Sequence, residues 1–455
     1  MEQDTQAVMT FASISGKKVH ADFDGGTVTS DGGVLFLRAI EAKLGVIQRF
    51  TQALRDRRHP SYVDHSYEEL LCQRIFQIAC GYEDANDCDS LRHDPGFKAA
   101  CNRLPLSGAP LGSQPTMTRL ENAAQRTALY RMARALVDTF VASYKTPPKA
   151  LILDIDDTDD STHGEQQMAL FNAHYGEYCY LPLHLYEGQS GKLITTILRP
   201  GSRPSGKDIV SILKRLVPYL RKQWPKVLLI LRGDSHFSAP EVHDFCDQHD
   251  LYYVLGQSSN PLLKARAQAL LEQAQKLYAQ KCAQAPSETC PNKVRLLTSF
   301  VYQAQSWQRP RRIVCKVEVS AQGDNLRFVV TNLEQARCSL VYDIAYCQRG
   351  RMENFIKNHK TFLHSDRTSC HRFEANQFLL LLHSAAYVLM HALGQWGLKG
   401  TEWTKSQFNI LQLRLLKVGA KVCEMATRIK VHYPTSFPLK EVYQKLMRNL
   451  AQAYP

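Results

Sequence analysis

Three carboxylates from separate parts of the chain have the residue types that metal-assisted phosphoryl transfer requires. Asp156 and Asp234 each follow an apolar run typical of a buried strand, and Glu353 lies in a predicted helix. Mg²⁺ prefers oxygen ligands, and two ions about 3.5 to 4 Å apart can activate an attacking oxygen and stabilise a leaving one. Without metal, three such acids would repel one another and raise their pKa values. We therefore treat Asp156, Asp234 and Glu353 as candidate catalytic and metal-binding residues.

A polar stripe surrounds Glu353 on its predicted helix. On a helix that turns by about 100° per residue, four side chains share an arc of about 60°: they are Tyr346, Arg349, Glu353 and Lys360. Taken alone, the stripe favours the interpretation of a solvated face with an i, i+4 ion pair worth a few tenths of a kcal/mol. Beside two aspartates, the phenol and the two cations would instead hold the phosphates that adjoin the site.

Apolar runs and turns predict the elements that must position these residues. Strands are expected at 150–156, 180–186, 193–198, 226–234 and 251–255, with helices over 207–223 and from a capping box at Ser238 and Glu241. The order suits an α/β fold with a mixed five-stranded sheet. If the first and fourth strands lie side by side, Asp156 and Asp234 meet in one cleft.

Changes in pattern divide the chain into five parts. Residues 1–145 are predicted to be helical, with arginine clusters that could grip a DNA backbone. Residues 146–259 form the first part of the catalytic core, and 260–340 read as a β-rich insertion. Residues 341–395 complete the core with the Glu353 helix. The last part, 396–455, is again helical.

Composition narrows the class of protein. The 455 residues carry a formal net charge of +13, which favours a polyanionic partner. The longest apolar run, 378–393, is shorter than the roughly 18 to 20 residues of a bilayer span, and the N-terminus lacks the pattern of a signal peptide. Thirteen cysteines without a Cys-x-x-Cys pair indicate reduced thiols in a cytoplasmic protein rather than a zinc site or disulfides.

The signature Tyr-x2-Arg-x3-Glu-x6-Lys resembles that of DDE insertion-sequence transposases, and several segments resemble the branch called the insertion sequence thirteen-eighty family. These segments are Leu-Asp-Ile-Asp-Asp-Thr-Asp-Asp-Ser-Thr-His-Gly (153–164), Leu-Arg-Gly-Asp-Ser-His-Phe (231–237), and the N-terminal stretches 29–33, 81–87 and 91–95. Two departures are His236, where the family has glycine, and the acids Asp154 and Asp157, which leave open which aspartate is the first catalytic acid.

The resemblance implies both a fold and an activity. It implies a ribonuclease-H-like core, dependence on Mg²⁺ that Mn²⁺ can replace, and cut-and-paste movement of the element's own DNA. The implied partners are the terminal inverted repeats and the target DNA. Because both ends of the element must be held together, the active complex is expected to be at least a homodimer.

The resemblance also points to Trp307 as a candidate for a further DNA contact. In related transposases a tryptophan of the insertion stacks on a base flipped out of the flanking DNA, and Trp307 stands beside Arg309, Arg311 and Arg312. The alternative interpretation is an ordinary half-buried tryptophan.

Two other functions fit part of the sequence. Asp154-Ile-Asp156-Asp-Thr158 matches the opening motif of haloacid-dehalogenase-like phosphatases, with Asp154 as nucleophile and Asp156 as acid/base. That fold needs a later aspartate where this chain has Ser238, and it leaves the stripe unexplained. A non-catalytic DNA-binding protein that descends from a transposase is the second alternative.

Overall fold

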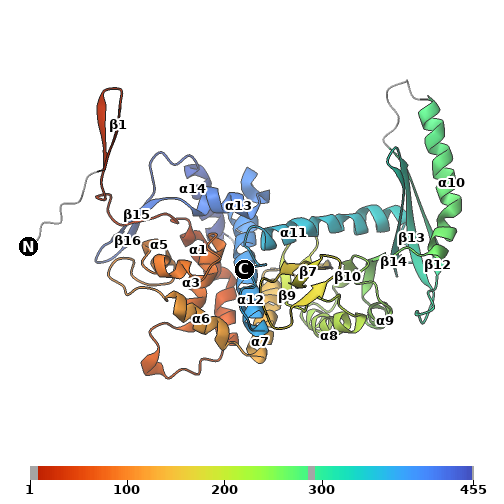
Figure 1. Cartoon of the computed structure of the whole chain (residues 1–455), viewed down its shortest axis with the longest axis horizontal. Coiled ribbons are helices and arrows are strands. Elements are labelled where there is room, and N and C mark those ends of the chain that lie inside the picture. The colour runs from red at the N-terminus through yellow and green to blue at the C-terminus, as the bar shows by residue number, and fades with distance from the viewer. Residues whose placement is uncertain (1–8, 285–292, 453–455) are drawn as a thin grey trace, which may run out of the picture. The chain divides into compact units, whose positions relative to one another are not determined.

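The computed structural model describes residues 9–284 and 293–452, which fall into two compact units (Figure 1). The helical unit combines residues 1–123 with residues 389–454, and the sheet unit covers residues 124–388. Packing therefore divides the chain near 123 and 388, whereas the sequence pattern predicted boundaries near 145 and 395. The helix at 126–142 accounts for the first difference, because it packs on the sheet.

The helical unit is built from both ends of the chain. Its helices are α1 (Val34–Leu44), α2 (Val46–Ala53), η1 (Pro60–Tyr62), α3 (Tyr67–Ala79), α4 (Asp87–Leu91), α5 (Pro95–Ala100), α6 (Gln114–Ala123), η4 (Leu393–Gly397), η5 (Glu402–Lys405), α13 (Phe408–Leu411), η6 (Gln412–Leu416) and α14 (Lys440–Gln452). Strand β3 (Val28–Thr29) pairs with β15 (Ala420–Glu424), which pairs with β16 (Ile429–His432). A separate hairpin joins β1 (Met9–Ile14) to β2 (Lys17–Ala21).

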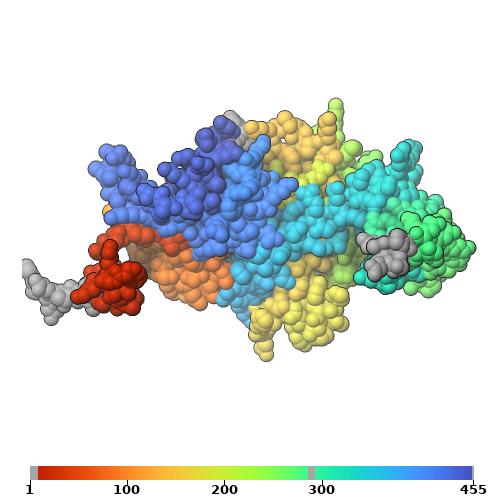
Figure 2. Space-filling model, turned by 90° about the horizontal axis from the view of Figure 1, so that it is seen from above, coloured from red at the N-terminus to blue at the C-terminus, as the bar shows by residue number. Residues whose placement is uncertain are grey.

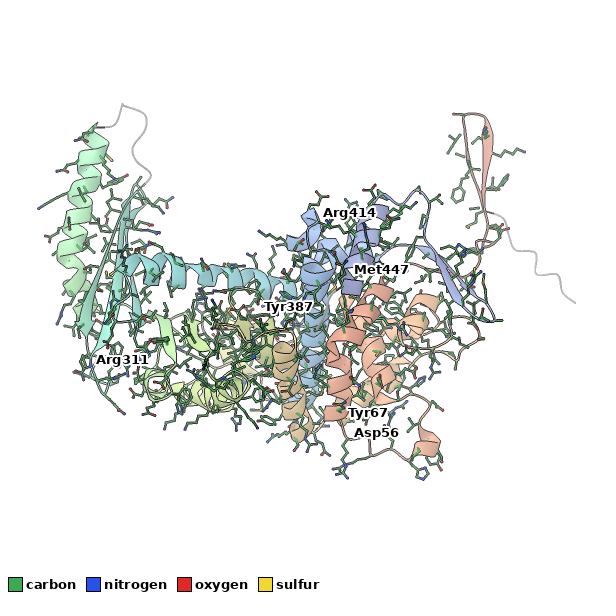
Figure 3. The ribbon with its side chains drawn as sticks, turned by 180° about the vertical axis from the view of Figure 1, so that it is seen from behind. Asp56, Tyr67, Arg311, Tyr387, Arg414 and Met447 are labelled. Atoms are coloured by element: carbon green, nitrogen blue, oxygen red, sulfur yellow. The ribbon has the colours of Figure 1, made fainter. Side chains whose placement is uncertain are left out.

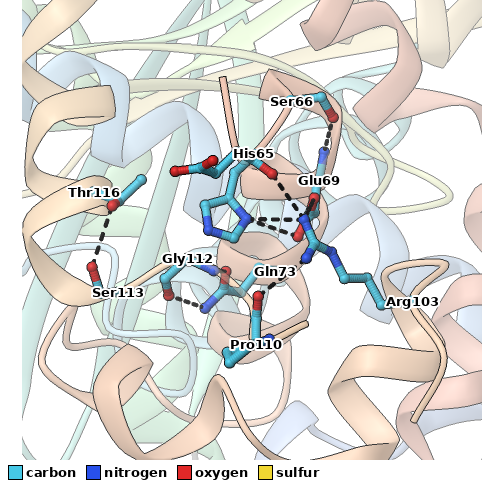
Figure 4. Close-up of polar contacts among 10 residues, drawn as sticks. His65, Ser66, Glu69, Gln73, Arg103, Pro110, Gly112, Ser113 and Thr116 are labelled. Carbon is cyan, nitrogen blue, oxygen red and sulfur yellow. Dashed lines mark hydrogen bonds and ion pairs between the residues drawn. The ribbon is translucent and has the colours of Figure 1, made fainter. Parts of the chain in front are cut away.

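Polar contacts fasten the loops of the helical unit to α3 (Figure 4). Ser66 caps α3 by accepting a hydrogen bond from the backbone N–H of Glu69, and Arg103 pairs with the Glu69 carboxylate at 2.8 Å. Gln73 both donates to and accepts from the backbone of Gly112, at 2.9 Å each way. These side chains therefore hold the segment 103–112 against one helix.

Some arginines of this unit are engaged within the protein. Arg58 forms an ion pair with Asp56 at 2.6 Å and lies over the ring of Tyr67, 4.2 Å from its centroid (Figure 3 labels Asp56 and Tyr67). Arg74 is buried against Glu121. These contacts account for part of the arginine pattern that the sequence suggested for DNA binding.

An eight-stranded sheet organises the sheet unit. Its order is β12 (Val294–Tyr302), β13 (Arg311–Ser320), β14 (Gly323–Thr331), β11 (Tyr252–Gln257), β10 (Leu228–Gly233), β4 (Ala150–Asp157), β8 (Leu183–Glu187) and β9 (Leu193–Ile197). The five predicted strands are consecutive neighbours in this order, from β11 to β9. The predicted five-stranded sheet is too small, because β14 pairs with β11 and joins the insertion to the same sheet. This pairing hides the backbone edge that β11 would otherwise expose.

Helices cover both faces of this sheet. They are α7 (Arg126–Ala142), α8 (Gly206–Gln223), α9 (Pro240–Gln248), α10 (Pro261–Gln284), α11 (Arg351–Lys360) and α12 (Phe373–Ala392). A small sheet of β5 (Asp160–Ser161), β7 (Glu177–Tyr180) and β6 (Leu170–Asn172) follows β4. The predicted capping box at Ser238 is wrong: Ala239 is the N-cap of α9, and the Ser238 hydroxyl donates to Gln257 Oε1 at 3.1 Å instead.

The long apolar run of the sequence lies mostly in the helix α12. Extended to Gly397, this helical stretch is long and apolar enough to cross a membrane by length and composition, yet 83% of its most apolar window is buried inside the protein. Such burial is typical of a core helix of a globular protein.

Candidate active site

Strand pairing brings the two aspartates together. β4 and β10 are parallel neighbours whose register pairs Leu228 with Ala150 and Arg232 with Asp154. The same offset of 78 residues relates Asp234 to Asp156, so the two acids lie opposite each other where the strands end. Neighbouring strands are about 4.8 Å apart. The predicted adjacency of the strands that lead to Asp156 and Asp234 is confirmed.

The surroundings of the Asp156 carboxyl group disfavour its ionised form. Its pKa is raised to about 7, with burial as the largest cause; Arg349 opposes the rise, and Asp234 and Asp157 add to it. The guanidinium Nη1 of Arg349 donates to Asp156 Oδ2 at 2.8 Å. A positive charge at this place therefore stabilises the ionised form of Asp156.

The predicted helix around Glu353 is helical throughout but not uniform. A π-helix, η2 (Leu340–Tyr346), is followed by a 3₁₀ turn, η3 (Cys347–Gly350), and only then by α11. Wide and tight turns succeed each other, so the angles predicted for a regular α-helix apply only from Arg351 onward. The local winding sets where Tyr346 and Arg349 point.

The first residue of the stripe reaches the ends of the strands. A Cβ atom at Gly256, near the end of β11, would stand 2.7 Å from the Tyr346 hydroxyl oxygen and 2.8 Å from the backbone nitrogen of Ser235. Only glycine leaves room there, so the hydroxyl lies directly beside the segment that carries Asp234. Burial raises the pKa of Tyr346, which keeps the phenol protonated.

Lys360, the last residue of the stripe, faces the segment that follows Asp156. Its ammonium group lies 3.1 Å from the Asp159 carboxylate and 3.4 Å from the Thr158 hydroxyl, and it also donates to the Asp159 carbonyl. Tyr346, Arg349 and Lys360 are all half-buried, whereas Glu353 is exposed. Three of the four residues therefore face the strand ends, and the solvated-face interpretation fails for them.

The sheet assembles two of the three proposed metal ligands. Among residues 9–284 and 293–452, no group of three or more His, Cys, Asp and Glu side chains is arranged to hold a metal ion. Glu353 acts electrostatically on Arg349, as Asp156 and Asp234 do, but it does not join the aspartates. Two close carboxylates, one of them with a raised pKa, are an oxygen donor set that suits a divalent cation.

The structure also separates Asp156 from its acidic neighbours. Asp154 is fully buried, and both its oxygens accept from Arg232, at 2.5 and 2.6 Å. Asp157 lies 3.8 Å from His236. Asp156 is therefore the acid best placed to meet a ligand at the strand end. A phosphatase nucleophile at Asp154 is not supported, because its carboxylate is inaccessible.

Trp307 lies inside the core, with 7% of its surface exposed. Its ring meets His243 and Tyr302 edge-on, with centroids 5.3 and 5.5 Å away. Nearby Arg311 is bound to Asp244 and Asp247 (Figure 3 labels Arg311). A base cannot stack on Trp307 in this conformation, so the structure favours the packing interpretation over the DNA contact.

Sequence reasoning missed the partners that orient the site. Arg232 lies in the apolar run that predicts a buried strand. Burying a charge there is costly unless an opposite charge is buried beside it. That signal could have identified the Arg232–Asp154 pair. The contacts of Lys360 with Thr158 and Asp159 had no comparable signal, because they join residues about 200 positions apart.

Comparison with known proteins assigns the chain to one family. No curated protein matches the chain. The cryo-EM structure of the piggyBac transposase synaptic complex with hairpin DNA is similar at a TM-score of 0.42 and 11% identity, over 94% of this chain and 86% of that chain. The model of the family described as transposase DDE domain group 1 matches residues 11–455. The chain therefore belongs to the transposase DDE domain group 1 family.

Proposed function

We propose that this protein is the transposase of a bacterial insertion sequence, which binds the terminal inverted repeats of its element and carries out DNA cleavage and strand transfer with Mg²⁺. One observation carries the proposal. Asp156 and Asp234 end neighbouring parallel strands, and Tyr346, Arg349 and Lys360 face the same strand ends. Acids beside cations that can hold phosphates form the arrangement that phosphodiester chemistry needs.

In this proposal the acids hold metal ions and the cations hold phosphates. When bound, divalent ions would activate the attacking oxygen and stabilise the leaving one. Asp156 and Asp234, with Glu353 as the third acid, would hold them. Arg349, now paired with Asp156, would then be free to hold a phosphate, and a guanidinium does so with two hydrogen bonds. Lys360 would fix the neighbouring phosphate as a point charge.

The proposed partners follow from the same chemistry. A net charge of +13 attracts a DNA backbone. Two element ends must be processed together, so we propose a homodimer as the active form, working on DNA in the cytoplasm. The insertion sequence thirteen-eighty family is the branch to which its motifs point.

The test is metal-dependent cleavage of the DNA that flanks the coding sequence. With Mg²⁺, the wild-type protein is expected to cut this duplex, and Asp234→Asn is expected to lose cleavage. Asp250→Asn makes the same change at an exposed acid in a left-handed turn that asparagine tolerates, and it should leave cleavage intact. Undiminished cleavage by Asp234→Asn would exclude this site. Binding without cleavage by any variant would favour the non-catalytic DNA-binding protein.

A further inference from the structure

The strands of the insertion continue past the edge of the sheet that carries the aspartates. The last pair between β11 and β14 joins Gln257 to Phe328, but β14 begins five residues earlier, at Gly323. β13 pairs with this overhang as far as Ser320, and β12 follows as far as Val294. A three-stranded ribbon therefore projects beyond the ends of β4, β10 and β11. Figure 1 shows β13 and β14 reaching past the helical segment that ends in α11.

The two faces of this ribbon have different surroundings. One face carries Cys315, Val317 and Phe328 and packs with α10 in the main core. On the other face, Val314 and Val329 pack against Val341 and Tyr342 of η2. In a strand every second residue shares a face, so Lys316 and Arg327, which pair across β13 and β14, continue the η2 face into the overhang.

Cations dominate the overhang on the η2 face. They are Lys293, Arg295, Lys316 and Arg327, against the two carboxylates Glu318 and Asp343. Arg295 contacts both acids, at 3.0 and 2.7 Å, and Lys316 is buried beside Glu318. Within residues 9–284 and 293–452, no carboxylate pairs with Arg327, whose side chain is exposed. Arg327 is therefore the cation of this face that has no carboxylate partner among the described residues.

Arg327 also lies close to the candidate active site. Burial raises the pKa of Tyr346, and the charged groups that act on this phenol include Arg349, Asp234 and Arg327. Tyr346 thus lies within electrostatic range of both Arg327 and Asp234. Figure 2 shows the cyan atoms of the segment around residues 340–360 beside the green and teal atoms of the insertion.

We propose that the insertion binds the DNA backbone through Arg327 on this overhang, supported by Arg295, rather than through Trp307. This inference rests on the proposed function. Trp307 follows β12 at the end of the ribbon opposite the aspartates, where Tyr302 pairs with Arg311. A duplex whose scissile phosphate lies at Asp156 and Asp234 extends along the strand ends in both directions. Lys360 meets it on one side, and Arg327 meets it on the other.

The experiment measures the affinity of the full chain for a duplex from the DNA flanking its coding sequence, over a range of salt concentrations. Removing one phosphate contact lowers the magnitude of the salt slope by about one and weakens binding about five- to tenfold. Arg327→Ala is expected to show both effects, and Arg327→Glu a larger loss. Arg327→Lys keeps the charge and should bind almost like the wild type.

Lys276→Ala is the matched control. Lys276 is an exposed cation of the same insertion, on α10, which covers the opposite face of the ribbon. Lys276→Ala should leave the DNA affinity and the salt slope unchanged. If the wild type binds and cuts DNA but Arg327→Ala keeps its salt slope, the inference is overturned and the proposed function stands. An equal loss in Lys276→Ala also overturns it. If the wild type neither binds nor cuts, the proposed function itself has failed.

Discussion

Strand β4 carries two aspartates that each pair with an arginine, one in the interior of the strand and one at its end. Asp154 and Arg232 are almost completely buried, with side-chain exposures of 0% and 1%. Asp156 follows two residues later on the same face of β4 and pairs with Arg349, and the side-chain exposures of this pair are 14% and 23%. Both pairs have short contacts, at 2.5 and 2.8 Å. They differ in what else can reach the carboxylate.

The inner pair is closed. Two hydrogen bonds from one guanidinium satisfy Asp154, and a Cβ at Gly188 would stand 2.5 Å from both side chains, so no ligand can enter. The outer pair uses one hydrogen bond, and a second acid, Asp234, shares its surroundings. The comparison shows that position along a strand, rather than residue type, separates a closed ion pair from one that a ligand can reach.

The sharpest way to break this comparison is to remove the charge of the outer acid. Asp156→Asn is expected to reduce DNA cleavage at least about 10³-fold, or about 4 kcal/mol of transition-state stabilisation. Single-turnover cleavage of the flanking duplex measures the effect, with circular dichroism to show that the fold is kept. A variant that cuts within tenfold of the wild-type rate would place the first catalytic acid elsewhere.

The inner acid should affect stability instead. Asp154→Ala leaves the Arg232 guanidinium buried without a counter-charge, which costs about 3 to 5 kcal/mol. Urea unfolding measures the loss. The double variant Asp154→Leu/Arg232→Met removes both charges and should recover most of it. If Asp154→Ala unfolds like the wild type, the pair does not hold the sheet.

Arg349 should influence both rate and pH dependence. Arg349→Ala is expected to slow cleavage about 100-fold, or about 2.7 kcal/mol, because a phosphate-holding cation is lost. Arg349 also lowers the pKa of Asp156, so the acid limb of the pH–rate profile should move to higher pH. Arg351→Ala, two residues further on at the start of α11, is the control. The Arg351 guanidinium donates to the Gln189 carbonyl at 3.0 Å, and its loss should change neither quantity.

The smallest effect concerns the stability of the metal-free protein. The pKa of Asp156 is about 7 in the folded chain, above its ordinary value of 3.8, so ionising this carboxyl costs stability as the pH rises from 4 through 7. Asp156→Asn carries no such cost. It should be more stable than the wild type by about 1 kcal/mol at pH 8, since the loss of the Arg349 partner offsets part of the gain. Below pH 4 the gain should vanish in thermal unfolding.

Sequence patterns predicted the parts of the fold that local physics decides. The helix expected at 207–223 forms as α8, and the strands leading to Asp156 and Asp234 lie side by side as expected. Regular helical spacing holds within α11, which carries Glu353 and Lys360. These features depend on periodicity and on the order of elements along the chain.

Other features depend on contacts between distant segments. The burial of Trp307 comes from His243 and Tyr302, which belong to different elements, and a tryptophan beside arginines gives no sign of it. The merging of the insertion with the main sheet rests on the pairing of β14 with β11, about 75 residues apart. The π-helix and 3₁₀ turn before α11 break the regular period on which the stripe was predicted.

The central place of β4 and β10 in the eight-stranded sheet also governs how the site opens. Each has a hydrogen-bonded neighbour on both sides, so their amides exchange with solvent only when the sheet itself comes apart. Glu353 belongs to a helix whose exposed side faces water. The two aspartates are therefore expected in the most slowly exchanging segment of the protein, and the third acid in a faster one.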